Sequence, residues 1–172
     1  VLLVDGERRR SWGAADGIAP GAVTFVDASR ELLVDGDGGM AVWQGGRFHA
    51  LQAEGVDLAN VSGIVVSSDG DRWLNTGHAL LHVRAADWRR SMDNPSRPLR
   101  GELWDELHGH PGLSDNISPV PTLRQAPDGA IWVVGVNGIA RLDRARIRRN
   151  TVAPLAEVRA LVAGETRYAG GD

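Results

Sequence analysis

The chain has 172 residues, of which 42% are hydrophobic and 24% charged, and its formal net charge is −3. This composition is too apolar for general disorder, and the weak negative charge gives no electrostatic reason to expect nucleic acid or an acidic membrane as a partner. Cysteine is absent, which excludes disulfides and thiolate metal sites, whereas 22 glycines and 8 prolines indicate many turns and short strands.

The first four residues form an apolar run that ends at Asp5-Gly6. We read it as a strand that the sequence enters midway, since neither an initiator methionine nor a signal-peptide pattern precedes it. We therefore expect the chain to belong to a longer protein. No apolar run in it approaches the roughly 18 residues that a membrane span needs.

A sequence unit then recurs at an offset of 59 residues. The residues that carry the match are Asp69, Gly70 and Trp73 in one copy and Asp128, Gly129 and Trp132 in the other. A weaker copy lies 40 residues earlier, with Leu33 in the place of Trp73. An offset of 40 is typical of a four-stranded blade of a β-propeller, and 59 corresponds to one blade plus an insertion.

Each copy reads as short strands joined by tight turns. The apolar runs 23–26, 64–66 and 120–123 are candidate first strands, and the segments 32–34, 73–74 and 131–134 are candidate second strands. Asp-Gly between them supplies the positive φ that a tight hairpin needs, and glycines return the chain again before a third strand. A fourth strand is predicted at 47–51. The sequence therefore predicts an all-β fold of consecutive four-stranded antiparallel propeller blades.

Helical periodicity is poor, and its best candidate is segment 99–108. Leu99, Leu103 and Leu107 recur there at spacings of four residues, with Trp104 beside them. A loop with a single helical turn fits this segment equally well.

The repeat of Asp-Gly, Trp and a glycine turn resembles the two-component-regulator propeller repeat, which forms sensor regions of large bacterial membrane sensors, often histidine kinases or hybrid regulators. The linkers Asp16-Gly17-Ile18 and Gly112-Leu113 resemble that family's connector. Near the end of the chain, Asn150 and Pro154, followed by Gly164 and Tyr168, resemble the start of the Ig-like, tyrosine-named module that follows these propellers.

The resemblance implies a division of the chain into five parts. These are 1–22 (outer strands of a preceding blade and a connector), 23–60 (a blade), 61–118 (a blade with a long insertion), 119–150 (a blade) and 151–172 (a linker and the first strand of the Ig-like module). The tryptophans are expected in the core between sheets. Three blades and a fraction make only an arc of a ring, so we expect self-association or contact with the remaining blades of the parent protein.

The insertion at 84–118 is the candidate ligand site, because long loops in compact domains tend to be functional or disordered. The residues proposed for ligand contact are Trp88, Arg89, Arg90, Arg100 and Trp104. Indole rings stack on sugars and guanidinium groups pair with carboxylates, so a small-molecule or oligosaccharide ligand is expected. The alternative is that the two tryptophans only hold the insertion against the sheets.

Other candidate sites have simpler explanations. His78 and His82 could share a strand face, and His108 and His110 lie close in sequence, but a metal site needs further ligands at a suitable spacing. The repeat carboxylates fall in turns, and no nucleophile elbow, P-loop or dinucleotide motif is present. The arginines between 141 and 149 lack interleaved aromatics, which argues against nucleic acid. We expect no catalytic residue, metal or cofactor.

The sequence and its resemblance together indicate a non-catalytic sensor segment of a bacterial two-component system. Such a segment lies in the periplasm, is membrane-anchored only through its parent protein, and leaves any kinase chemistry to other parts of that protein. Two alternatives stay open: a propeller enzyme, such as a lyase or glycoside hydrolase, and a scaffold propeller that binds another protein. A propeller fold by itself does not decide between them.

Overall fold

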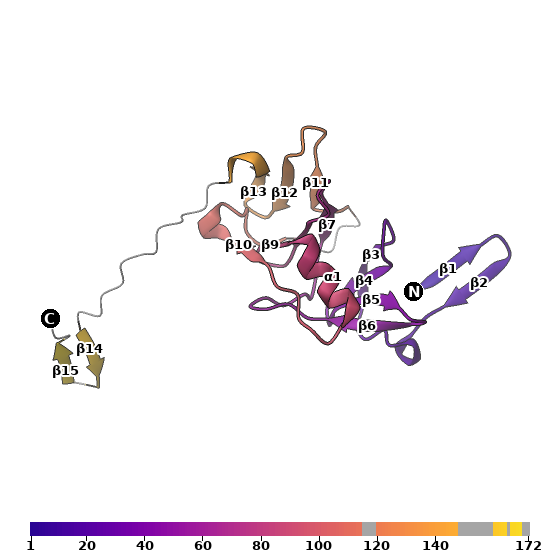
Figure 1. Ribbon diagram of the computed structural model, residues 1–172, viewed down its shortest axis with the longest axis horizontal. Coiled ribbons are helices and arrows are strands. Elements are labelled where there is room, and N and C mark those ends of the chain that lie inside the picture. The colour runs from indigo at the N-terminus through magenta and orange to yellow at the C-terminus, as the bar shows by residue number, and fades with distance from the viewer. Residues whose placement is uncertain (115–119, 148–159, 165, 170–172) are drawn as a thin grey trace.

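The computed structural model describes residues 1–114, 120–147, 160–164 and 166–169. The described part is mostly β-structure, arranged as small antiparallel sheets with one α-helix (Figure 1). Within these ranges, no helix combines the length and the apolar character that a membrane crossing requires.

The chain begins with an amino-terminal hairpin followed by the first sheet. The hairpin is formed by β1 (Leu2–Asp5) and β2 (Arg8–Ser11), and the first sheet by β3 (Val23–Asp27), β4 (Leu33–Gly36), β5 (Gly39–Gln44) and β6 (Arg47–Leu51), in chain order. Gly45 and Gly46 join β5 to β6 with φ of 58° and 89°, the backbone that a two-residue hairpin turn needs.

The second and third sheets repeat this arrangement. The second sheet contains β7 (Gly63–Val66), β8 (Arg72–Asn75), β9 (Leu80–Val83) and β10 (Glu102–Trp104), and the third contains β11 (Leu123–Gln125), β12 (Ile131–Gly135) and β13 (Gly138–Leu142). Helix α1 (Ala85–Asp93) lies between β9 and β10. A carboxy-terminal hairpin, β14 (Ala160–Ala163) and β15 (Thr166–Ala169), stands apart from the sheets in Figure 1.

The central hairpins of the three sheets have the same register. The second and third strands pair Leu33 with Val42, Trp73 with His82, and Trp132 with Arg141. These pairs are separated by the 40- and 59-residue offsets seen in the sequence. Trp73 and Trp132 therefore occupy equivalent places, and Leu33 occupies the same place in the first sheet.

The turns that precede these strands explain the Asp-Gly signal. The Asp69 carboxylate accepts the Asp71 N–H at 3.2 Å, and the Asp128 carboxylate accepts the Ala130 N–H at 3.0 Å. The glycine after each aspartate has positive φ, 86° at Gly70 and 83° at Gly129. The aspartate thus closes the turn, and the glycine provides the left-handed residue.

The sheets stack face to face, and successive side chains along each strand enter cores on opposite faces of the sheet. The first sheet packs on the second through a core that includes Leu33, Val42, Leu74 and Leu81. The opposite face of the second sheet packs on the third, through a core that includes Trp73, Leu80, Ile131 and Val133. The amino-terminal hairpin packs in the same sense on the first sheet, where Trp12 joins Val34, Ala41 and Phe48.

The hairpin also matches the outer strands of the sheets. Asp5 pairs with Arg8 across a two-residue turn, as Gln44 pairs with Arg47, and backbone hydrogen bonds between Val1 and Trp12 extend the ladder. The hairpin is therefore equivalent to β5 and β6 of the first sheet.

The insertion differs from its prediction. Of the two alternatives for 99–108, the helix is wrong and a single helical turn is present: the segment contains strand β10 and one 3₁₀ turn, Glu106–His108. The helix is α1, earlier in the insertion, and β10 returns to pair with β9 as the fourth strand of the second sheet. The extra length thus lies largely between the third and fourth strands.

Two further expectations need correction in the third sheet. Its first strand is Leu123–Gln125 rather than 120–123, and Val120 is exposed. Trp132 is 42% exposed, although a core position was predicted for it. Its face of the third sheet is equivalent to the Trp73 face of the second, but no sheet covers it in the described part of the chain.

Only part of the segment that was predicted to begin the Ig-like module lies within the described residues. Asn150 and Pro154 lie outside the described residues. Gly164, with φ of 60°, forms the turn between β14 and β15, and Tyr168 lies on β15.

Candidate functional site

The structure buries the first of the predicted ligand residues. Trp88 on α1 is 1% exposed, and its indole N–H donates to a Glu31 carboxylate oxygen at 3.2 Å. The Arg72 guanidinium lies over the same ring, 4.2 Å from its centroid, and donates to that Glu31 oxygen at 2.5 Å. Trp88 therefore joins α1 to the first and second sheets and cannot stack on a ligand.

Two of the predicted arginines do come together, in a groove beside α1. Arg90 and Arg100 line a cavity of about 430 Å³ whose other walls are given by Glu54, Asp87, Ser91, Arg97 and Pro98. This volume is within the range of small-molecule sites. We call this cavity the arginine groove.

Both arginines are already paired within the arginine groove. Arg90 donates to Asp87 at 2.6 Å, and Arg100 donates to Glu54 at 2.7 Å. The hydrogen bond to Glu54 raises the pKa of Arg100, so its guanidinium stays charged. These arginine side chains are more than half exposed, and such pairs in water are weak enough for a carboxylated ligand to compete for the guanidinium groups.

The remaining predicted residues lie outside the groove. Arg89 is exposed on α1, and Trp104 is half-buried against the core between the second and third sheets. Trp104 instead lines a small cavity of about 60 Å³ together with His110. The structure therefore brings together Arg90 and Arg100, but not the two tryptophans.

His82, His108 and His110 are held in hydrogen bonds to Asp71, Asp105 and Asn75. The His82 ring stacks on Trp73 at 4.0 Å between centroids and contacts the Asp71 carboxylate at 2.8 Å, while the other Asp71 oxygen accepts the first amide of α1, from Ala85. His78 is exposed in the turn after β8. Among the described residues, no three His, Asp or Glu side chains are grouped so that they could hold a metal ion.

A polar network joins the second and third sheets. Asn75 is fully buried; its amide donates to Thr122 at 2.7 Å, and its oxygen contacts His110 at 2.8 Å. The Thr122 hydroxyl lies 2.6 Å from that of Ser62. Burial lowers the pKa of His110, which favours the neutral ring in this position.

Asp35 occupies the position of the first sheet that is equivalent to Asn75. Its side chain is completely buried, and Oδ1 accepts the Val61 N–H at 2.8 Å, but Oδ2 has no partner. Burial raises the pKa of Asp35 to about 8. A carboxyl group thus fills a place where the second sheet uses an uncharged amide, and it holds the segment that leads into β7.

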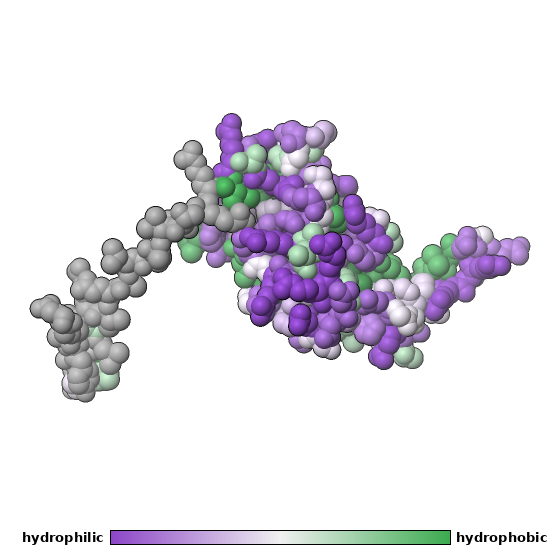
Figure 2. Space-filling model, viewed as in Figure 1, coloured by the Kyte–Doolittle hydropathy of each residue, from purple (hydrophilic) through white to green (hydrophobic). Residues whose placement is uncertain are grey.

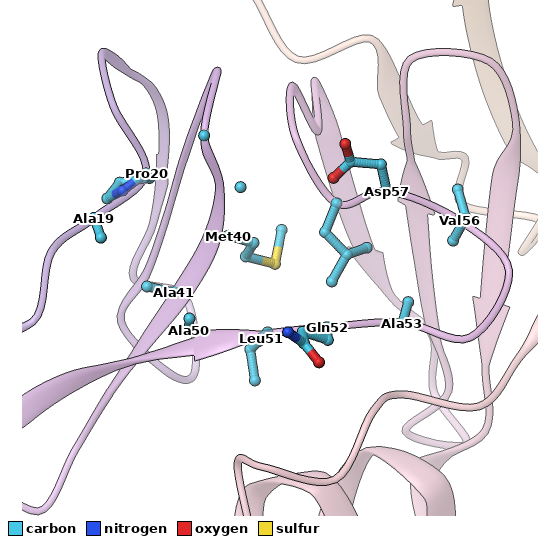
Figure 3. A pocket seen from close by; sticks show the side chains of 13 residues that line it. Ala19, Pro20, Met40, Ala41, Ala50, Leu51, Gln52, Ala53, Val56 and Asp57 are labelled. Carbon is cyan, nitrogen blue, oxygen red and sulfur yellow. The ribbon is translucent and has the colours of Figure 1, made fainter.

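Two open clefts flank that same segment. One, of about 350 Å³, lies along the first sheet, and its labelled polar side chains are Gln52 and Asp57 (Figure 3). The other, of about 520 Å³, lies between the turn of the second sheet and that of the third, where His78 and Ser114 are among its walls. Asp57 borders both clefts, but its Oδ1 accepts the Ala59 N–H at 2.9 Å and so stabilises a local turn. Neither cleft carries a cluster of charged groups comparable to the arginine groove.

The sequence did not indicate every residue of the arginine groove. Arg97 and Pro98 were within the predicted insertion, but Glu54 comes from the segment after β6, and its Arg100 partner is 46 positions away. Only the opposite charges of two separate segments could have suggested this pair.

Comparison with known proteins adds no identification: no protein-family model and no curated protein matches this chain.

Proposed function

We propose that the three sheets are successive blades of a β-propeller, and that the chain is a non-catalytic sensor segment of a bacterial two-component system, located in the periplasm. The observation that carries the propeller is the identical register of three hairpins, of which the first two present the same face to the next sheet. Such repeated stacking is how propeller blades are arranged. The sensor role is drawn from the resemblance of the repeat to the two-component-regulator propellers.

The arginine groove is the proposed ligand site. Arg90, Arg97 and Arg100 supply three positive charges, against two negative charges from Glu54 and Asp87. A ligand with one or more carboxylates, such as an acidic oligosaccharide, would replace these internal acids as the partner of the guanidinium groups. Binding would then break the side-chain link between Arg100, just before β10, and the segment after β6.

Thermal unfolding with and without ligand tests this assignment. A carboxylated oligosaccharide should raise the melting temperature, because it binds the folded state, while its neutral analogue should not. The variant Arg90→Gln/Arg100→Gln should lose the rise. The exposed Arg89, which lies on α1 outside the groove, provides the matched control, Arg89→Gln. An equal rise in the double variant would reject the groove, and hydrolysis of the oligosaccharide would favour an enzyme instead.

The two-component assignment has a separate test in the parent reading frame. It should encode further Asp-Gly…Trp units and a membrane-spanning segment linked to a kinase or regulator. A reading frame without a membrane span would reject the sensor role and leave the groove as a simple binding site.

A further inference from the structure

The third sheet carries an apolar face that the described part of the chain leaves open. Trp132, Val134 and Ile139 lie on this face with exposed fractions of 42%, 43% and 67%. Val134 pairs with Ile139 across β12 and β13, and Trp132 pairs with Arg141, so the side chains form one continuous surface. We call it the Trp132 face.

The equivalent faces of the other two sheets are interfaces. In the second sheet, Trp73 and Leu80 occupy the places of Trp132 and Ile139, and both are buried against the third sheet. In the first sheet, Leu33 and Met40 occupy these places and are buried against the second. The Trp132 face thus continues a surface that packs on a neighbouring sheet twice in this molecule.

The complementary surface lies on the amino-terminal hairpin. By register, Leu2 and Val4 occupy the places of Ala41 and Trp43, on the side of the hairpin that faces away from the first sheet. They are 62% and 57% exposed, and Figure 2 shows apolar surface at the base of this hairpin beside hydrophilic surface. Ala41 and Trp43 themselves pack in the core that receives Trp12. We call the surface of Leu2 and Val4 the hairpin face.

In the described part of the chain, the two faces do not meet. The cores connect the hairpin to the first sheet, the first sheet to the second, and the second to the third. Figure 1 accordingly places the hairpin and the third sheet at opposite ends of this row. A contact between unlike faces at the two ends is heterologous and joins copies head to tail.

We propose that the Trp132 face docks on the hairpin face of a second copy of this chain. Burial of the exposed indole and aliphatic side chains drives the contact, as it does between the sheets within one copy. Arg9 pairs with Val4 and therefore lies on the hairpin face, where it can cover the indole of Trp132. The same type of contact, a guanidinium group over an indole ring, occurs elsewhere in the molecule: Arg10 lies 5.0 Å from the centroid of Trp12 and 5.1 Å from that of Trp43. The proposal rests on the stacking of the sheets and does not depend on the sensor role.

Sedimentation velocity of the 172-residue chain provides the test. The wild type should associate with rising concentration, and Trp132→Asp should remain monomeric. Leu107→Asp is the matched control, because Leu107 is 93% exposed and lies on neither face. Circular dichroism should report the same fold for all variants, since every substituted side chain is exposed. A monomeric wild type, or association that survives Trp132→Asp, would overturn the proposal.

Mixing two variants shows which surface of the second copy binds the Trp132 face. Leu2→Asp/Val4→Asp should be monomeric alone, yet form a dimer with Trp132→Asp, because each variant retains the face that the other lacks. This dimer should not grow into larger species. If Leu2→Asp/Val4→Asp alone forms a dimer that Trp132→Asp abolishes, the Trp132 faces bind each other, and the head-to-tail arrangement is wrong.

Discussion

The second and third sheets share a strand register but differ in what covers them. The second is packed on both faces, so Trp73 is 1% exposed, whereas the third is packed on one face, and Trp132 is 42% exposed. The local pattern of aspartate, glycine and tryptophan therefore determines where a residue lies in its sheet. Its burial is determined by the neighbouring sheet, which the local pattern does not contain.

The largest expected effect comes from truncating the two equivalent tryptophans. Trp73→Ala should lower the free energy of unfolding by about 3–5 kcal/mol, because it removes a buried indole and leaves a cavity. Trp132→Ala should change it by less than about 1 kcal/mol, because its side chain is already partly in water. Urea unfolding of the monomeric chain at low protein concentration measures both. Equal losses would show that the Trp132 face is covered in solution.

Asp35 and Asn75 offer a second comparison, between a carboxyl group and an amide at equivalent places. The folded-state pKa of Asp35 is about 8, above the 3.8 of an ordinary aspartate, so the folded protein binds this proton more tightly than the unfolded chain. The resulting stabilisation is fully present below about pH 4 and is lost as the pH rises to about 8. Stability should fall across that range, by on the order of a few kcal/mol.

The variant Asp35→Asn tests this effect. The asparagine side chain keeps an oxygen that can accept the Val61 N–H, but it cannot ionise. The free energy of unfolding of the variant should therefore depend less on pH than that of the wild type. Urea unfolding at several pH values between about 4 and 8 measures the difference. Parallel pH profiles for the wild type and the variant would show that Asp35 does not carry the dependence. Asp57, the other carboxylate that influences Asp35, provides the control Asp57→Asn.

The same contrast between local and distant information explains what the sequence predicted. Asp-Gly turns and apolar alternation are local, and they identified the hairpins and the offsets between them. Helix α1 was missed because its first amide is capped by Asp71 from the turn before β8, and Arg84 at the N-cap position offers no side-chain cap. Strand β10 was missed because its three residues are half-buried and give no clear alternation.

The candidate site was predicted in the same uneven way. Arg90 and Arg100 were identified from composition, and they do meet in one groove. Trp88 was proposed for ligand stacking because it lies among arginines in the insertion. Nothing near it in the sequence reveals that Arg72 covers its ring. The contacts that decide its role come from Glu31, 57 positions away in the sequence, and from Arg72 on β8.

These contacts give the third prediction. Glu31→Gln should lower the free energy of unfolding by about 1.5–3 kcal/mol, because the Arg72 guanidinium, whose side chain is 9% exposed, loses its charged partner. Glu54→Gln removes the carboxylate partner of Arg100 in a pair exposed to water, and should lower the free energy of unfolding clearly less than Glu31→Gln. Urea unfolding compares the two variants. Equal costs would mean that burial does not distinguish the pairs.

The smallest expected effect concerns the turn between the second and third strands. A Cβ at Gly135 would lie 2.5 Å from the carbonyl oxygen of Pro111, whereas a Cβ at Gly77 would have no neighbour within 4 Å. Gly135→Ala should therefore cost about 1–2 kcal/mol, and Gly77→Ala less than about 0.5 kcal/mol.

The reason for this difference is again a neighbour rather than the turn itself. Gly36 has the same place in the first sheet as Gly135 in the third, and there a Cβ would lie 2.4 Å from the Pro20 oxygen. In both sheets a Pro-Gly connector crosses the turn, and its proline carbonyl accepts a turn amide, from Gly38 or from Asn137. The second sheet has Thr76 at this place, and no Pro-Gly connector precedes that sheet. If Gly135→Ala unfolds in urea at the same midpoint as Gly77→Ala, the connector yields to the added methyl group, and close approach does not explain the glycine.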